Sequence, residues 1–136
     1  CMQPCYVIDT HVWVWQLFNP KRLSVSVVAI LEAADRFEVQ IVVPVVVLAE
    51  MSMIAQKQRV QGFNANHLPL IVSAVEAHPA YRLSVLSADL ILSSQSFRQI
   101  PDVFDRLIAT EAVSLGAHLL TRDPVIAASG LVRTVW

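Results

Sequence analysis

The chain has 136 residues, a formal net charge of −1, 55% hydrophobic residues and only 15% charged residues. Its length suits one domain with a single core, and we expect one domain over residues 1–136. The small net charge excludes a whole-protein positive field, so any contact with nucleic acid has to depend on a local site. The high apolar content predicts a thoroughly buried sheet or apolar contact surfaces.

Membrane insertion and secretion are both disfavoured by the apolar segments. The longest run without a polar side chain covers residues 41–49, far short of the ~20 residues that a membrane-spanning helix needs. No basic segment precedes the first apolar run, and Asp9 interrupts that run, so no signal peptide is expected. The expected location is the cytoplasm. Cys1 and Cys5 stand too far apart for a disulfide in an extended segment, and Cys1, directly before Met2, is interpreted as a cloning remnant.

The N-terminal half alternates short apolar runs with helical spacings of apolar residues. Thr10 is a candidate cap for the first helix, and Pro44 suits the first turn of the third. In chain order, we expect a strand at 5–9, a helix at 10–18, a helix at 23–36, a strand at 39–43 and a helix at 44–59.

The C-terminal half continues this alternation. Ser87 is a candidate helix cap, and Gly116 is expected to end a long helix. In chain order, we expect a helix at 65–77, a strand at 81–86, a helix at 88–97, a helix at 103–115, a strand at 117–121 and a strand at 131–136. Strands that are apolar on both faces and alternate with helices predict an α/β fold, in which helices flank a central, mainly parallel sheet of about four or five strands.

The helix at 103–115 carries an apolar stripe, which we expect to dock on the sheet. Its stripe residues recur at spacings of three and four and are Phe104, Ile108, Ala112 and Leu115. Glu111 is assigned to the polar face of this helix, and Asp102 to its N-terminal cap.

Four of the eleven acidic residues occupy positions where a carboxylate is costly. Asp9 closes the first strand, and Asp123 follows the strand before the C-terminal segment. Glu50 lies within an apolar helix, and Asp105 lies beside an apolar stripe. Because the carboxyl ends of parallel strands meet at one edge of a sheet, we expect these four side chains to gather there.

Carboxylates that are brought together repel one another, and burial raises their pKa further. Such a cluster persists when a cation occupies it, and oxygen ligands without His or Cys favour Mg²⁺ or Mn²⁺ over zinc. Divalent ions held by carboxylates serve phosphoryl chemistry, because they activate water and stabilise charge on the leaving oxygen. The acids therefore predict a phosphodiester nuclease.

Each acid also has a structural interpretation. Asp9 or Asp123 could cap a helix, and Glu50 could be an ordinary, partly exposed helix residue. Asp105 could neutralise the helix dipole or pair with a neighbouring arginine. Two arginines adjoin the acids and are candidates for contacts with RNA phosphate or with a carboxylate, namely Arg106 and Arg122.

Several segments resemble a known family. "YVIDTHVWVW", the helix around Glu50, "DVFDRLIATEA" and "HLLTRD" occur in the order seen in PIN-domain ribonucleases. The similarity runs from Tyr6 to about Val135 and is greatest to the VapC-type toxins of bacterial toxin–antitoxin pairs. It implies a PIN-like three-layer sandwich and Mg²⁺- or Mn²⁺-dependent cleavage of RNA.

The resemblance also implies roles and partners. The catalytic and metal-binding set would be Asp9, Glu50, Asp105 and Asp123, with Glu50 acting directly or through water. The auxiliary residues would be Thr10, Thr121 and Asp102. Similar toxins form homodimers and are silenced by a small antitoxin, whose tail lies in a groove and can push a basic side chain into the acidic site.

The chain departs from the family pattern beside these motifs. Val103 stands where related toxins often carry Pro, and Gln99 or Ile100 where they often carry an upstream His. These positions do not ligate metal, so the departures concern the substrate-facing edge and leave the acidic set complete.

Other functions are weighed against the nuclease. A catalytically silent PIN-fold protein would use the fold to bind RNA or a partner, and a structural oligomer would use the acids as caps. A haloacid-dehalogenase-like phosphatase is disfavoured, because His11 stands where that chemistry needs a second Asp and no catalytic Lys lies between the motifs. His11 is assigned a structural place in the first helix.

The first helix carries more bulky apolar side chains than one face of a short helix can hide. These side chains are Trp13, Trp15, Leu17 and Phe18. We expect two of them in the core and the others in a contact patch for an antitoxin or a second copy of the chain.

Overall fold

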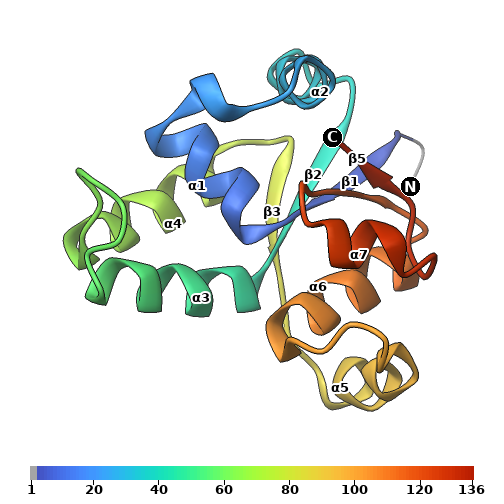
Figure 1. The fold of residues 1–136 in the computed structure, drawn as a ribbon. Coiled ribbons are helices and arrows are strands. Elements are labelled where there is room, and N and C mark those ends of the chain that lie inside the picture. The colour runs from blue at the N-terminus through green and yellow to red at the C-terminus, as the bar shows by residue number, and fades with distance from the viewer. Residues whose placement is uncertain (1–2) are drawn as a thin grey trace.

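A computed structural model describes residues 3–136, so the expectations for Cys1 and Met2 lie outside the described residues (Figure 1). One five-stranded sheet with the order β3-β2-β1-β4-β5 organises the fold, and every pairing in it is parallel. The strands are β1 Cys5–Ile8, β2 Gln40–Pro44, β3 Tyr81–Ser84, β4 His118–Leu120 and β5 Thr134–Val135. The predicted parallel α/β sheet is confirmed, with β3 and β5 shorter than expected.

Seven α-helices surround the sheet within the described residues. They are α1 Thr10–Phe18, α2 Val25–Asp35, α3 Val45–Gln56, α4 Leu68–Ala77, α5 Ala88–Ser94, α6 Val103–Ser114 and α7 Pro124–Ala128. Figure 1 shows α1, α3 and α4 to one side of the sheet and α5, α6 and α7 to the other. The sheet is therefore the middle layer of three. None of the helices described is long and apolar enough to cross a membrane.

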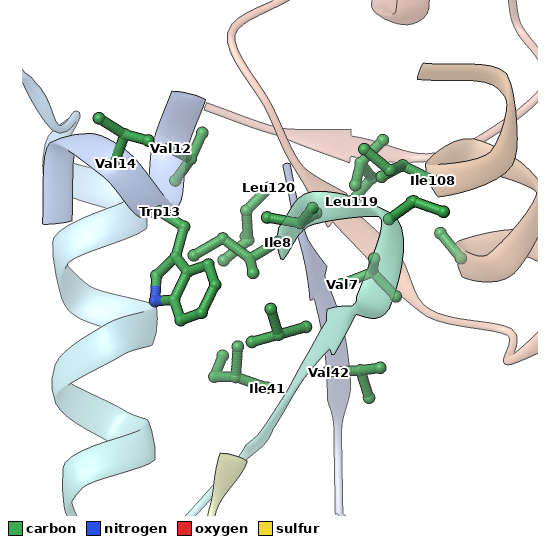
Figure 2. Close-up of a cluster of buried hydrophobic side chains, with 14 of the residues drawn as sticks. Val7, Ile8, Val12, Trp13, Val14, Ile41, Val42, Ile108, Leu119 and Leu120 are labelled. Atoms are coloured by element: carbon green, nitrogen blue, oxygen red, sulfur yellow. The ribbon is translucent and has the colours of Figure 1, made fainter. Parts of the chain in front are cut away.

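Alternate strand residues supply the cores on the two faces of the sheet, because successive side chains of a strand point to opposite sides. In Figure 2, Ile8 and Ile41 point toward Trp13 of α1, whereas Val7 and Val42 point the other way. All five side chains are buried, as expected for strands covered on both faces. The apolar composition of the chain is explained by this double core.

Helix α6 is buried more widely than its stripe predicts. Ile108 and Ala112 are fully buried, but Leu115 is 39% exposed because it is the C-cap, where the chain turns into Gly116 at φ 64°. Glu111, expected on a polar face, is only 7% exposed. The reason is that Glu111 lies beside Arg82 and Ser84 of β3, so the tertiary fold covers this position of the helix.

Two helix starts differ from the prediction. Asp9, and not Thr10, is the N-cap of α1, and Thr10 is the first helical residue. Pro44 is the last residue of β2 and the N-cap of α3 rather than part of its first turn. Ser87 caps α5 as expected, since its hydroxyl accepts a hydrogen bond from the amide of Leu90 at 3.1 Å.

The strand order places a topological switch point between β1 and β4. The chain runs outward from β1 through β2 to β3, and then crosses to the other side of β1 to form β4 and β5. In open α/β sheets the crevice beyond the carboxyl ends of the strands at such a point is the usual ligand site. Asp9 directly follows β1, and its amide donates to the carbonyl of Leu120 at the end of β4 at 3.0 Å.

Candidate active site

Asp9 is the most deeply buried acid at the switch point, with 3% of its surface exposed. Its Oδ1 accepts from the amide of Thr10 at 2.8 Å, and its Oδ2 accepts from the hydroxyl of Thr121 at 2.6 Å. Burial raises the pKa of Asp9, and these two donors offset part of the rise. Asp9 thus both caps α1, as its structural interpretation predicted, and presents its carboxylate at the sheet edge.

Thr121 connects the ends of β1 and β4. Its hydroxyl donates to Asp9 and accepts from the amide of Asp123 at 3.0 Å. One oxygen of Asp123, Oδ1, accepts from the amides of Val125 and Ile126 at 2.8 and 3.3 Å and so caps α7. The cap interpretation of Asp123 holds for this oxygen, and its Oδ2 makes no hydrogen bond within residues 3–136.

Glu50 reaches the same edge from α3. Its Oε1 accepts from the hydroxyl of Thr10 at 2.5 Å, which links the second turn of α3 to the first turn of α1. Burial raises the pKa of Glu50, the Thr10 hydroxyl lowers it, and the charge of Asp9 raises it. Thr10 and Thr121 therefore each hold one of the acids in place.

Asp102 and Asp105 approach from the start of α6. Asp102 is exposed and caps the helix, since its Oδ1 accepts from the amide of Asp105 at 3.1 Å. Asp105 is half-buried, and its carboxylate makes no hydrogen bond within residues 3–136. Burial raises its pKa, and the neighbouring carboxylates raise it further, to about 8. These neighbours are, in decreasing order of effect, Asp9, Asp102, Asp123 and Glu50.

The acids have no cationic partner among the described residues. Arg106, a candidate carboxylate contact, instead donates to the carbonyls of Ile100 and Pro101 at 2.9 and 3.3 Å. This expectation was wrong because the segment before α6 brings those carbonyls within reach of the guanidinium. Arg122 is exposed and forms no ion pair, and its Cζ lies 5.9 Å from the centroid of Trp136.

The donor set fits Mg²⁺ or Mn²⁺ in its chemistry. All the acids offer oxygen, and burial together with four neighbouring carboxylates raises the pKa of Asp105 to about 8. Across residues 3–136, no three His, Cys, Asp or Glu side chains converge closely enough to hold a metal as they stand. Mutual repulsion of the carboxylates explains this open arrangement.

The structure places two further residues beside the acids, and the sequence did not reveal these positions. His11 is part of α1, with its ring centroid 6.2 Å from that of Trp15, and it is exposed and lines a cavity together with Asp9 and Asp123. Trp136 packs against Trp15 of the same cavity, with ring centroids 5.6 Å apart. The D-T-H order in the sequence could have indicated His11, since the second residue of a helix N-terminus at a strand end points to the sheet edge. No pattern in the sequence pairs Trp136 with Trp15.

Comparisons with known proteins agree with this architecture. A family model described as PIN domain matches residues 6–129. The crystal structure of VapBC2 from Rickettsia felis bound to a DNA fragment from their promoter contains a similar chain, with a TM-score of 0.69 and 16% identity over 96% of this chain and 97% of that one. FitAcB from Neisseria gonorrhoeae is similar with a TM-score of 0.57 and 14% identity over 96% of each chain.

No curated protein sequence matches the chain. At such low identities the two solved structures establish the fold, and the family follows from the match to residues 6–129. That match covers nearly all of the sheet and both acid-bearing strand ends. The chain belongs to the PIN-domain family.

Proposed function

We propose that the protein is a metal-dependent ribonuclease and the toxin of a toxin–antitoxin pair. The observation that carries the proposal is the group of five acids at the switch point, where burial and then the charges of the four other carboxylates raise the pKa of Asp105 to about 8. PIN domains are generally nucleases, and a cation at this edge would relieve the repulsion. Both similar solved structures, VapBC2 and FitAcB, carry the names of toxin–antitoxin complexes, which supports the toxin half of the proposal.

The acids would have different roles in catalysis, according to their positions in the site. Asp9, Asp105 and Asp123 would hold Mg²⁺ or Mn²⁺, and Glu50 would ligate through water or orient the attacking water as a base. The bound ion would supply the charge that activates water and stabilises the leaving oxygen. Thr10 and Thr121 keep Glu50 and Asp9 in fixed orientations through hydrogen bonds of 2.5 and 2.6 Å. Asp102 adds negative charge and starts α6.

The attack would proceed in line on phosphorus and leave a 5′-phosphate and a 3′-hydroxyl. Such chemistry depends on positioning and on electrostatic stabilisation more than on covalent steps by the protein. Arg122 is exposed next to Asp123 and would contact RNA phosphate, whereas Arg106 is held by backbone carbonyls.

An antitoxin would occupy the apolar cavity beside α1. This cavity of about 370 Å³ is lined by Trp13, Leu17 and Phe18 of α1 together with residues of α4 and β3. The sequence expected two bulky side chains of α1 in the core and two at a contact patch. Trp13 is buried and Leu17 is 40% exposed, while Trp15 and Phe18 are half-buried. The cavity fits an apolar helix or strand of a partner.

A homodimer would use a second apolar surface. Around α5 several large apolar side chains are exposed, namely Val85, Leu86, Ile91 and Leu92. This surface lies on the opposite side of the molecule from α4 in Figure 1, so an antitoxin and a second copy could bind together. Such a patch on a small domain is typical of a contact surface.

A cleavage assay tests the proposed function. The purified protein should cleave RNA with Mg²⁺ or Mn²⁺, lose the activity in EDTA, and lose it in Asp9→Asn. Glu76→Gln, which changes an exposed acid on α4, is the matched control and should cleave as the wild type does. Metal-independent cleavage or an active Asp9→Asn would contradict the mechanism. RNA binding without any cleavage under these conditions would favour the catalytically silent alternative.

A further inference from the structure

The cavity lined by Asp9 and Asp123 also has an aromatic side, which binding of a metal ion does not explain. It measures about 380 Å³, within the usual range of small-ligand pockets. Asp9, His11, Trp15, Arg122 and Asp123 line it, together with the first residues of α7. A group that enters this cavity therefore lies directly beside the proposed catalytic carboxylates.

The aromatic side of the cavity is the indole of Trp15, and a second indole and two arginines lie around it. Trp15 is half-buried, and the ring of Trp136 meets it edge-on at 63° with centroids 5.6 Å apart. The Cζ of Arg22 lies 4.5 Å from the centroid of Trp15, and that of Arg122 lies 5.9 Å from the centroid of Trp136. Both guanidinium groups belong to exposed residues. Two positive charges and two indoles thus adjoin an otherwise acidic edge.

A purely structural explanation accounts for part of this arrangement. The contact between the indoles anchors the end of the chain after β5, which has only two residues in the sheet. That explanation does not require an open cavity beside Trp15, nor exposed arginines on both rings. Aromatic faces flanked by arginines are the usual means by which proteins hold unpaired nucleotides, because every base has a π-face and every linkage a phosphate.

We propose that this cavity is a nucleobase subsite. An unstacked base of single-stranded RNA packs on the cavity-lining surface of Trp15, and Arg22 and Arg122 contact the adjoining phosphates. The subsite rests on the proposed nuclease function and deepens it, because it restricts the substrate to unpaired segments such as loops and single strands. A duplex holds its bases in the stack, so it cannot place one on Trp15 without first opening.

Binding in EDTA separates this proposal from catalysis. The probes are a mixed-sequence single-stranded RNA of twelve nucleotides and an abasic strand of the same length and charge. The wild type should bind the strand with bases more tightly, and Trp15→Ala should weaken that binding roughly 5- to 150-fold. Its affinity for the abasic strand should stay unchanged. Trp15→Tyr keeps an aromatic face and should retain most of the preference.

The ratio of the two affinities distinguishes stacking from a structural role. A variant that merely loosens the fold would weaken both probes alike, and thermal unfolding of each variant checks for this. Arg122→Gln should weaken the binding of both strands without changing the preference for bases. It should also reduce the dependence of the affinity on salt concentration by about the amount expected for one phosphate contact.

Three results would overturn the subsite. They are equal affinity of the wild type for the two strands, an unchanged preference in Trp15→Ala, and binding of neither strand. Equal affinity would leave the Trp15 surface to a protein partner. Cleavage is read separately with Mn²⁺, so a protein that prefers bases but does not cleave would keep the subsite and lose the nuclease. A protein that cleaves RNA but shows no preference for bases would keep the nuclease proposal and lose the subsite.

Discussion

Helix α6 carries two desolvated carboxylates, and their surroundings are opposite. Asp105 lies in its first turn and Glu111 lies less than two turns further on, and burial raises the pKa of both. Neighbouring carboxylates raise that of Asp105 further, to about 8, whereas the Ser84 hydroxyl and the charge of Arg82 lower that of Glu111. Burial alone therefore does not distinguish these two acids. The sign of the neighbouring charges does, and only Asp105 lacks compensation by the protein itself.

Neutralising each carboxylate in turn should give the largest difference between them. Asp105→Asn should reduce metal-dependent cleavage of RNA by at least about 100-fold, because a metal ligand is lost. Glu111→Gln, the matched change on the same helix, should cleave at close to the wild-type rate. The two rates at saturating Mn²⁺ check this. Similar losses in both variants would mean that α6 acts through its stability rather than through Asp105.

Packing of the shared helix should be separable from its charge. Ile108 is fully buried on the sheet side of α6, so Ile108→Ala should lower the free energy of unfolding by about 2–5 kcal/mol. Leu115→Ala, at the partly exposed C-cap, should cost less than about 0.5 kcal/mol. Urea unfolding in EDTA measures both. Equal costs would mean that the docking surface of the helix is assigned wrongly.

Loss of the hydrogen bonds around Asp9 should cause the next largest decrease in the free energy of unfolding. Thr121→Val removes the donor to Asp9 and the acceptor for the amide of Asp123, both in a buried position, and should cost about 1–3 kcal/mol. Thr110→Val is the control, because the equally buried hydroxyl of Thr110 donates only to the carbonyl of Arg106, which lies one turn back in the helix. A larger loss in Thr110→Val would contradict the bridging role of Thr121.

The pH dependence of stability should be the smallest effect. A folded pKa of about 8 lies above the ordinary 3.8, so the folded protein binds more protons than the unfolded chain between about pH 4 and 8. The metal-free protein should therefore lose stability as pH rises through this window. Solvent screening of the half-exposed carboxyl limits the loss to about 1–2 kcal/mol, a few degrees in Tm.

Thermal unfolding in EDTA from pH 5 to 9 measures this loss. Asp105→Asn should flatten the profile and raise the Tm near pH 8. Glu111→Gln should flatten it less, because Ser84 and Arg82 offset part of the rise that burial causes in the pKa of Glu111. A metal-free protein that gains stability between pH 5 and 8 would have the opposite sign and would refute the assignment of Asp105.

The acidic edge could be predicted because it depends on little more than strand ends. In any parallel sheet the residues after the strands share one edge, so Asp9 and Asp123 lie along the same edge whatever the strand order. That β1 and β4 are neighbours depends on tertiary topology, and the bridge through Thr121 follows from it. The hydrophobic periodicity of the sequence predicts neither the pairing of β1 with β4 nor this hydrogen-bonded bridge.

The misassigned residues share a different cause. The pattern predicts a polar face at Glu111 because its own helix is amphipathic, but in the fold Glu111 is buried beside Ser84 and Arg82 of β3. Arg106 is a candidate for a carboxylate contact because of sequence proximity, but its guanidinium donates to the backbone carbonyls of Ile100 and Pro101 instead. The local sequence pattern predicts which residues share one face of a helix. Which groups contact that face depends on tertiary packing.

Calorimetric titration with Mn²⁺ at pH 7, in two buffers of different ionisation enthalpy, tests most directly whether the acidic edge is a cation site. At this pH the Asp105 carboxyl, with a pKa of about 8, is largely protonated in the metal-free protein. Binding should therefore release close to one proton per site, and the release should vanish in Asp105→Asn. Absence of Mn²⁺ binding, or binding without proton release at pH 7, would contradict the account.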